Sequence, residues 1–522
     1  MSTAQNTDPR TPVIVGVGQV SERLGEPGYR RRSPADLAAD AAREAIADTG
    51  ADAGAVTRAI GTIAGIRQFE VSFPGARAPL GCSDNFPRSA AGRIGAGPVR
   101  AILEVTGGQG PQHLVNEFAA AIAAEEEASD VVLLAGAEAI STIERLARAD
   151  PATTDVPDFT EHPGGTLEDR GLAIEGMFSP HLVTHGLINA ATHFALFENA
   201  RRARLRRSRA EYAAEMGTLF EPFTRVAAAN PHSAAPVERD ARGLVTRSGS
   251  NRVIADPYTR YIVARDKVNQ GAAVLLMSAG AARRLGVPED RWVFLHGHAD
   301  RRERDLMERA DLSAAPAAVM AARHALEVAG VTAGDLTAID LYSCFPVPVF
   351  NVSEGLGLAP GDPRGLTVTG GLPFFGGPGN NYVMHSIAET VARVRRTPGA
   401  FGLVGALGGV MTKYSAGVYS TAPAEYLPDR SKELQAEIDG WAPRPEAVEA
   451  SGPATVETFT VVPGRDGSRT GIVIGRLDAD DRRFIANATD EATLAVLESD
   501  DPFGARLQAR SDGQRNTVTL PS

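Results

Sequence analysis

Apolar and polar positions along the chain predict strands and helices in alternation. Residues 11–20 form a Val-rich apolar run typical of a buried strand, and residues 36–49 predict a helix. Ser33 and Pro34 stand where an N-cap and a first helical residue are expected, and Gly50 stands where the helix ends. A second strand then follows near AIGTIAGI.

The same order returns in the second part of the chain when Gly50 is aligned with Gly330. Residues 292–345 again predict a strand, a helix, a glycine stop and a strand. Two Gly-rich turns, at 105–112 and 368–381, each precede a further helix and strand. The repeat predicts a duplicated α/β fold with mainly parallel sheets covered by helices.

Two segments fall outside this repeat. The pattern loosens between Asp150 and about Thr259, which predicts a cap domain over the sheet ends. After about Pro428, short strands broken by turn signals predict a small, barrel-like β domain. The expected domains are a first half at 11–280 with the cap at about 150–259, a second half at 281–424, and the β domain at 430–522.

Charge and composition exclude several functions. The formal net charge of −11 argues against non-specific nucleic-acid binding. No 18-residue apolar run and no signal-like start are present, so we expect no membrane span and a cytoplasmic location. The two cysteines, Cys82 and Cys344, form no Cys-x-x-Cys pair, so we expect reduced thiols, no metal site and no required cofactor.

Local motifs indicate a family. LLAGAEAIS at 133–141, VNQGAAVLLMS at 268–278 and DLYSCF at 340–345 are similar to thiolase motifs, the last to the HDCF box of sterol-carrier-protein type thiolases. Residues 11–422 therefore resemble the thiolase superfamily, and the tail resembles the additional C-terminal domain of type 1 thiolase-like proteins. This implies a duplicated five-layered α/β fold with an inserted cap and an OB-like barrel.

Thiolase chemistry needs a cysteine nucleophile at a helix N-terminus, a histidine in a Gly-His-Pro turn and a second cysteine as acid and base. At the matching positions this chain has Gly107, Gly377 and Ala406. Cys344 survives in the HDCF-like box, where Tyr342 and Ser343 replace histidine and aspartate. The resemblance therefore implies that covalent thiolase chemistry is absent or uses a different nucleophile.

Backbone groups of the family site persist whatever side chain is present. The N–H groups of Gly107 and Gly408 are expected to hold a thioester carbonyl. The substrate-binding residues implied by the resemblance are Gly107, Gly108, Gly377, Gly408 and Asn380, with helix capping as the alternative role of Asn380.

The candidate catalytic residues are Cys344 and His385. The alternatives are a buried apolar residue for Cys344 and a packed helix residue for His385. Thiolase caps supply cations to the CoA phosphates, so Arg201, Arg204 and Arg207 are candidate phosphate ligands. A solvated helix face is the alternative for these arginines.

Three functions remain open at this point. The first is a thiolase-like protein of lipid metabolism that binds acyl-CoA or a related CoA thioester but lacks most catalytic side chains. The second is an active acyltransferase that uses Cys344. The third is a scaffold whose C-terminal domain binds a protein partner. Phe459, Phe484 and Phe503 are the only aromatic residues after Trp441, so nucleic-acid binding by this domain is not expected.

Overall fold

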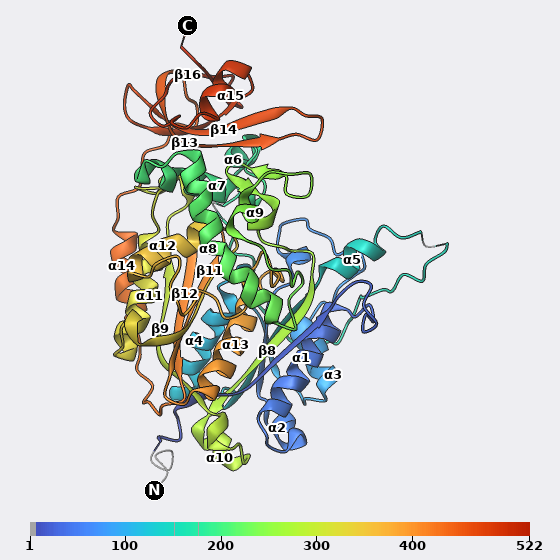
Figure 1. Cartoon of the computed structure of the whole chain (residues 1–522). Helices are drawn as coiled ribbons and strands as arrows, with labels where there is room; N and C mark the ends of the chain where they lie inside the picture. The colour runs from blue at the N-terminus through green and yellow to red at the C-terminus, as the bar shows by residue number, and fades with distance from the viewer. Residues whose placement is uncertain (1–6, 151, 176, 522) are drawn as a thin grey trace.

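A large mixed sheet and a small barrel organise the molecule. The computed structural model describes residues 7–150, 152–175 and 177–521. The sheet has ten strands in the order β10-β11-β12-β9-β1-β8-β4-β2-β3-β5, and a closed barrel of five strands lies at the opposite end from the N-terminus (Figure 1). Among the described residues no helix is long and apolar enough to cross a membrane.

The first half begins as the sequence predicts. Ser33 caps α1 by accepting a hydrogen bond from the Asp36 N–H, and Gly50 follows the helix with a φ of +69°. The elements of this half are β1 (Pro12–Glu22), α1 (Pro34–Asp48), α2 (Ala53–Ala59), β2 (Thr62–Gly65), α3 (Phe86–Ile94), β3 (Arg100–Leu103), α4 (Gly110–Ala123), β4 (Val131–Ala139), α5 (Ile140–Leu146), β5 (Glu168–Asp169), β8 (Asn269–Ser278) and α10 (Ala279–Arg284).

The second half repeats the first. Gly330 ends α11 with a φ of +67°, as Gly50 ends α1, so the predicted repeat is confirmed. Its elements are β9 (Val293–Arg302), α11 (Pro316–Ala329), β10 (Leu336–Leu341), α12 (Pro346–Leu356), α13 (Tyr382–Arg396), β11 (Phe401–Gly408) and β12 (Lys413–Ser420). The halves join where β1 pairs with β9 through Ile14 and Val293.

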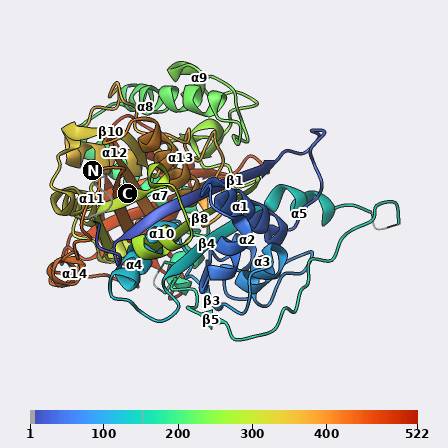
Figure 2. The same cartoon turned by 90° about the horizontal axis from the view of Figure 1, so that it is seen from below.

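These elements form the expected five layers. Figure 2 shows α1, α2 and α3 gathered on the side of the sheet away from α11 and α12. Helices α4 and α13 pack on each other and on strands of both halves, so they form the middle layer. The prediction of mainly parallel sheets is wrong, because β1–β8, β4–β8, β9–β12 and β11–β12 are antiparallel. The short turn at 409–412 permits only an antiparallel β11–β12 pair.

The cap lies between the sheet and the barrel. It contains α6 (Pro180–Thr184), α7 (Ala190–Leu205), α8 (Arg209–Ala229), α9 (Ala241–Val245), β6 (Val253–Ala255) and β7 (Tyr258–Thr259). Outside the cap, short 3-10 helices connect longer elements, at Phe69–Val71, Arg260–Ile262, Glu289–Arg291, Leu306–Glu308 and Ala333–Asp335.

The C-terminal region forms the predicted barrel. After α14 (Ser431–Asp439) come β13 (Gly452–Pro463), β14 (Arg469–Leu477), β15 (Arg483–Ala488), α15 (Glu491–Leu497), β16 (Arg506–Ser511) and β17 (Asn516–Thr519). Phe459 and Phe484 belong to the barrel's own core, whereas Ile472, Ile474 and Ile485 belong to the main core of the chain. The barrel therefore shares a continuous apolar interior with the cap.

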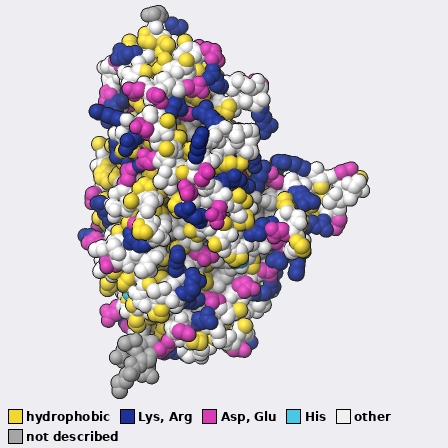
Figure 3. All heavy atoms as spheres, in the orientation of Figure 1, with side chains coloured by type: hydrophobic (Ala, Val, Ile, Leu, Met, Phe, Trp, Pro, Cys, Tyr) yellow, Lys and Arg dark blue, Asp and Glu magenta, His cyan; other side chains and the backbone are white. Residues whose placement is uncertain are grey.

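Surface charge is mixed. On the face shown in Figure 3, basic and acidic side chains are interspersed over the cap, the sheet region and the barrel. Cys82 and Cys344 are both free thiols.

Candidate functional site

Loops of both halves and of the cap surround one cavity of about 520 Å³. The turn before α4, the turn before α13 and the end of β11 all reach it, as does the segment between β10 and α12. It is lined by six of the residues expected from the sequence: Gly107, Gly108, Cys344, Gly377, Asn380 and Gly408. The structure therefore brings together residues that are up to three hundred positions apart in the chain.

Most of the cavity wall is apolar. The cap contributes Phe178 and Phe194, and the two halves contribute Phe73, Phe345 and Leu372. Such a wall fits an apolar chain, because small-molecule pockets of this size are lined mainly by hydrophobic and aromatic groups.

One of the two expected backbone donors is already used. The N–H of Gly107 donates to Oδ1 of Asn380 at 3.0 Å. The Asn380 amide in turn donates to the carbonyl of Arg67 and to Oγ of Ser72, both at 2.9 Å. In this structure the Gly107 N–H is not free to hold a carbonyl, which corrects the sequence-based expectation for that group. Asn380 instead fixes the Gly-rich turn in place.

Gln109 occupies the space between two of these glycines. A Cβ atom added to Gly107 or to Gly408 would overlap its Oε1 atom. That oxygen is buried, and it has no hydrogen-bond partner among the described residues. Gln109 was not predicted as a site residue from the sequence, because its contact with Gly408 arises only when the chain folds.

Cys344 lies where the chain passes from β10 into α12. It precedes Phe345, the N-cap residue of α12, and is 7% exposed. Burial raises the pKa of the Cys344 thiol well above its ordinary value, so the thiol is neutral at pH 7. A neutral thiol is a poor nucleophile. Tyr342 also faces the cavity, with its hydroxyl group beside Gly108.

His385 lies outside the group of residues that line this cavity. It is fully buried on α13, where Nδ1 lies 2.8 Å from Oε1 of Gln19 and the ring packs edge-on against Phe375. Burial lowers the pKa of His385 well below its ordinary value. The structure therefore does not bring His385 together with Cys344 at the cavity wall.

The arginine run on α7 is largely engaged within the protein. Arg201 is 2% exposed and pairs with Glu354 and Glu215, and Arg204 pairs with Glu354 as well. Arg207 is exposed beyond the end of α7. Arg201 and Arg204 thus have carboxylate partners already, and none of the three lines the cavity.

A different set of cations is grouped around Arg265, which adjoins the cavity wall in sequence. Arg265 stands between Ala264 and Asp266, which both line the cavity. Burial and then the charges of Arg260 and Arg239 lower the pKa of Arg265. Within the described part of the chain, none of these three arginines makes an ion pair, and the Nε atom of Arg265 has no hydrogen-bond partner. Sequence reasoning missed this group because the arginines are separated in the chain.

Two carboxyl groups lie behind the cavity wall. Glu138 is 1% exposed and accepts a hydrogen bond from the N–H of Phe69 at 2.7 Å. Burial raises the pKa of Glu138 well above its ordinary value and raises the pKa of Glu70 to about 7. These groups are therefore wholly or partly protonated at neutral pH.

Comparison with known proteins places this geometry in context. Residues 433–514 match the family model of the thiolase-like protein type 1 additional C-terminal domain. A crystal structure of a monomeric SCP2-thiolase-like protein type 1 from Mycobacterium smegmatis is 48% identical, with a TM-score of 0.84. The alignment covers 98% of this chain and 100% of that chain. No curated protein sequence matches the chain.

More distant structures share the fold. The Ltp2–ChsH2(DUF35) aldolase is 20% identical with a TM-score of 0.56, and the alignment covers 79% of this chain and 98% of that chain. The dimeric peroxisomal thiolase of Saccharomyces cerevisiae is 15% identical with a TM-score of 0.55, covering 80% of this chain and 99% of that chain. At these identities the likeness concerns the fold alone.

Proposed function

The chain belongs to the family of type 1 SCP2-thiolase-like proteins, and from this premise we propose that it binds an acyl-CoA or a related thioester without covalent thiolase chemistry. The observation that carries the proposal is the apolar cavity of about 520 Å³ at the point where the family's motif positions converge. The cavity is large enough for an acyl chain. It is present although glycine or alanine stands at the positions of the family's reactive side chains.

Three features argue against covalent catalysis at this cavity. Gly107, Gly377 and Ala406 carry no group that can attack a thioester or move a proton. The thiol of Cys344 is held neutral by burial. The N–H of Gly107 donates to Asn380, so one of the two N–H groups expected to hold a thioester carbonyl is already used.

The polar end of such a ligand has a candidate partner. Arg265 is the sequence neighbour of two residues of the cavity wall, Arg239 and Arg260 are close enough to lower its pKa, and none of the three forms an ion pair in the described part of the chain, although the charge of Asp266 partly offsets them. Guanidinium groups match phosphate geometry, and their mutual repulsion is relieved when an anion binds. These arginines replace Arg201 and Arg204 as the proposed phosphate ligands.

The test is isothermal titration with CoA alone and with acyl-CoAs of increasing chain length. If the chain lies in the cavity, affinity rises with chain length by up to about 0.8 kcal/mol per buried methylene group. Ala190→Trp narrows the cavity from the exposed start of α7. It is expected to weaken the binding of long acyl-CoAs far more than the binding of CoA. Ala210→Trp, on an exposed position of α8 that does not line the cavity, is the matched control.

Two outcomes would contradict the proposal. One is an affinity that does not depend on chain length in the wild-type protein. The other is an equal loss of binding in Ala190→Trp and Ala210→Trp. A loss of CoA binding in Arg265→Gln with the chain-length dependence retained would support the role of the arginines as phosphate ligands.

A further inference from the structure

A second cavity, of about 560 Å³, shares the Gly-rich turn with the first. Gly107 and Gly108 line the apolar cavity, whereas Gln109 lines this second one. Its other walls come from α4, β9, β12 and α14, and most of their residues have polar or charged side chains. We refer to it as the polar cavity.

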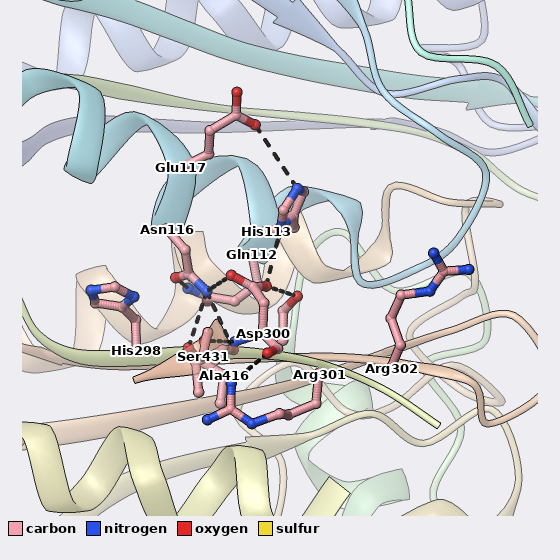
Figure 4. Close-up of polar contacts among 12 residues, drawn as sticks. Gln112, His113, Asn116, Glu117, His298, Asp300, Arg301, Arg302, Ala416 and Ser431 are labelled. Carbon is pink, nitrogen blue, oxygen red and sulfur yellow. Dashed lines mark hydrogen bonds and ion pairs between the residues drawn. The ribbon is translucent and has the colours of Figure 1, made fainter. Parts of the chain in front are cut away.

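Most acidic groups of the polar cavity already have cationic partners, whereas Asp439 accepts a hydrogen bond from the side-chain amide of Gln435. Arg170 donates to Glu104 at 2.7 Å and to Glu117 at 2.6 Å. Figure 4 shows His113 between Glu117 and Asp300, and its Nδ1 lies 3.2 Å from Oδ1 of Asp300. Burial alone would lower the pKa of His113, but Asp300 outweighs it and raises the pKa to about 9. Glu104, His113 and Glu117 could together face a metal ion, but the Arg170 guanidinium binds both carboxylates.

Four cations that line this cavity form no ion pair within the described residues, and one of them, Arg301, is buried and donates to the carbonyl oxygen of Asp300. The other three in the described ranges are Arg302, Lys413 and Lys432. Figure 4 shows Arg302 extending away from the His113–Asp300 pair, with no contact drawn. Lys413 of β12 and Arg302 of β9 are direct cross-strand partners. Like charges in that arrangement destabilise a sheet unless an anion lies near them.

Lys413 is the most confined of the three. It is 6% exposed, and its ammonium group donates a hydrogen bond to the carbonyl oxygen of Thr106 at 2.8 Å. An ammonium group has three donors, so this one acceptor does not satisfy it. Burial and then the charge of Arg302 lower its pKa to about 8, against the opposing charges of Glu104, Glu175 and Asp305.

Lysine is rare in this chain. Of 53 basic residues only three are lysine, namely Lys267, Lys413 and Lys432. Lys267 is exposed and pairs with Glu144 at 2.7 Å, whereas the other two line the polar cavity. Lysine binds phosphate as a compact point charge, and arginine binds it as a fork.

We propose that the polar cavity is a separate binding site for a phosphate group, held by Arg302, Lys413 and Lys432. A phosphate dianion offsets the unpaired charge and accepts the unused donors of Lys413. The volume of about 560 Å³ exceeds what one phosphate group fills, so the site takes a phosphorylated small molecule, and inorganic phosphate offers the same chemistry.

The three lysines make a direct test possible. Protein labelled with carbon-13 at lysine Cε gives one signal for each lysine, and a pH titration gives the pKa of each. Addition of glycerol 3-phosphate is expected to raise the pKa of Lys413 and to shift the Lys432 signal, while Lys267 stays unchanged. An equal ionic strength of sodium chloride is the reference, because screening alone acts on all exposed charges.

Variants test the assignment without disturbing the fold. Arg302 is exposed, so Arg302→Gln should fold, should raise the Lys413 pKa without any ligand, and should weaken phosphate binding by about tenfold or more. Lys432→Gln should weaken binding in the same direction. Arg396→Gln, on an exposed position at the end of α13, is the matched control and should bind as the wild type does.

The outcomes separate the possible ligands. Tighter binding of glycerol 3-phosphate than of inorganic phosphate assigns the site to phosphate esters, and equal binding assigns it to phosphate itself. Tighter binding of citrate than of either would overturn the phosphate assignment. So would lysine signals that respond to phosphate no more than to sodium chloride.

Discussion

At the scale of single residues, Cys344 decides between the binding protein and the acyltransferase. Its thiol is neutral because burial raises its pKa well above the ordinary value. We therefore expect no thiolysis of 3-ketoacyl-CoA by CoA, for short or long chains, in the wild-type protein or in Cys344→Ala. Mass spectrometry after incubation with acyl-CoA should show no adduct. Activity or an adduct that Cys344→Ala removes would establish Cys344 as a nucleophile.

Glu70 gives a prediction on the pH dependence of stability. Burial raises its pKa from 4.5 to about 7, and its Oε2 atom has no hydrogen-bond partner among the described residues. The folded protein binds this proton more tightly than the unfolded chain does. Burial of the charged Glu70 carboxylate therefore does not destabilise the fold below pH 4.5, where the group is protonated in both states, and destabilises it fully above pH 7. Glu70→Gln should raise the free energy of unfolding by on the order of 2 kcal/mol at about pH 8 and leave it unchanged at about pH 4. Urea denaturation at both pH values checks this, and a gain of equal size at both would contradict it.

At the scale of elements, buried arginines join the barrel to the rest of the chain. Arg483 of β15 is fully buried, binds Glu457 through two hydrogen bonds and donates to the carbonyl groups of Met307 and Arg309. On α7, Arg202 donates to the carbonyl of Asp500 at 2.7 Å. The barrel is thus part of the fold, and its removal would expose Ile472 and Ile474 to water.

Replacement of Arg483 should therefore destabilise the whole chain. Arg483→Met leaves Glu457 and three backbone carbonyl groups without their partner, which costs about 3 to 5 kcal/mol. Arg482→Met is the control, because Arg482 is exposed and pairs with Asp480. Chemical denaturation should show one transition that shifts for Arg483→Met and not for Arg482→Met. A separate early transition for the barrel would show that the two regions unfold independently.

At the scale of the whole molecule, the sheet edge next to β3 is covered. β5 pairs with β3 through Ile102 and Leu103, and Arg100 pairs with Glu168 at 2.7 Å. An uncovered strand edge is a site at which a second chain can pair. The related protein from Mycobacterium smegmatis is described as monomeric, and the thiolase of Saccharomyces cerevisiae as dimeric.

We expect the chain to be a monomer of 54.8 kDa in light scattering after size-exclusion chromatography. Replacement of residues 165–172 by a Gly-Ser linker removes β5 and should produce association that increases with concentration. A wild-type dimer would contradict this prediction, as would a linker variant that stays monomeric at every concentration.

The sequence predicted the parts of the fold that depend on local signals. Ser33, Gly50 and Gly330 mark helix ends through their own chemistry, and they lie where the structure has those ends. The helices α14 and α15 were not predicted, because short elements between turns carry little periodicity. Gln109 and Arg265 were missed because tertiary packing gives them their neighbours. The direction in which Arg201 points from α7 cannot be read from a run of arginines.

The conformation of the Gly-rich turn opposes a return to thiolase chemistry through substitution of Gly107 alone. Gly107→Cys alone would place the new side chain on the Gln109 amide, and Gly107 has a φ of +144°, which disfavours any side chain. The flexible end of the Gln109 side chain can move aside, but the φ of Gly107 belongs to the turn itself and would strain a cysteine there in either case. An engineer who wants thiolase activity must therefore reshape this turn as well as supply reactive groups at Gly107, Gly377 and Ala406.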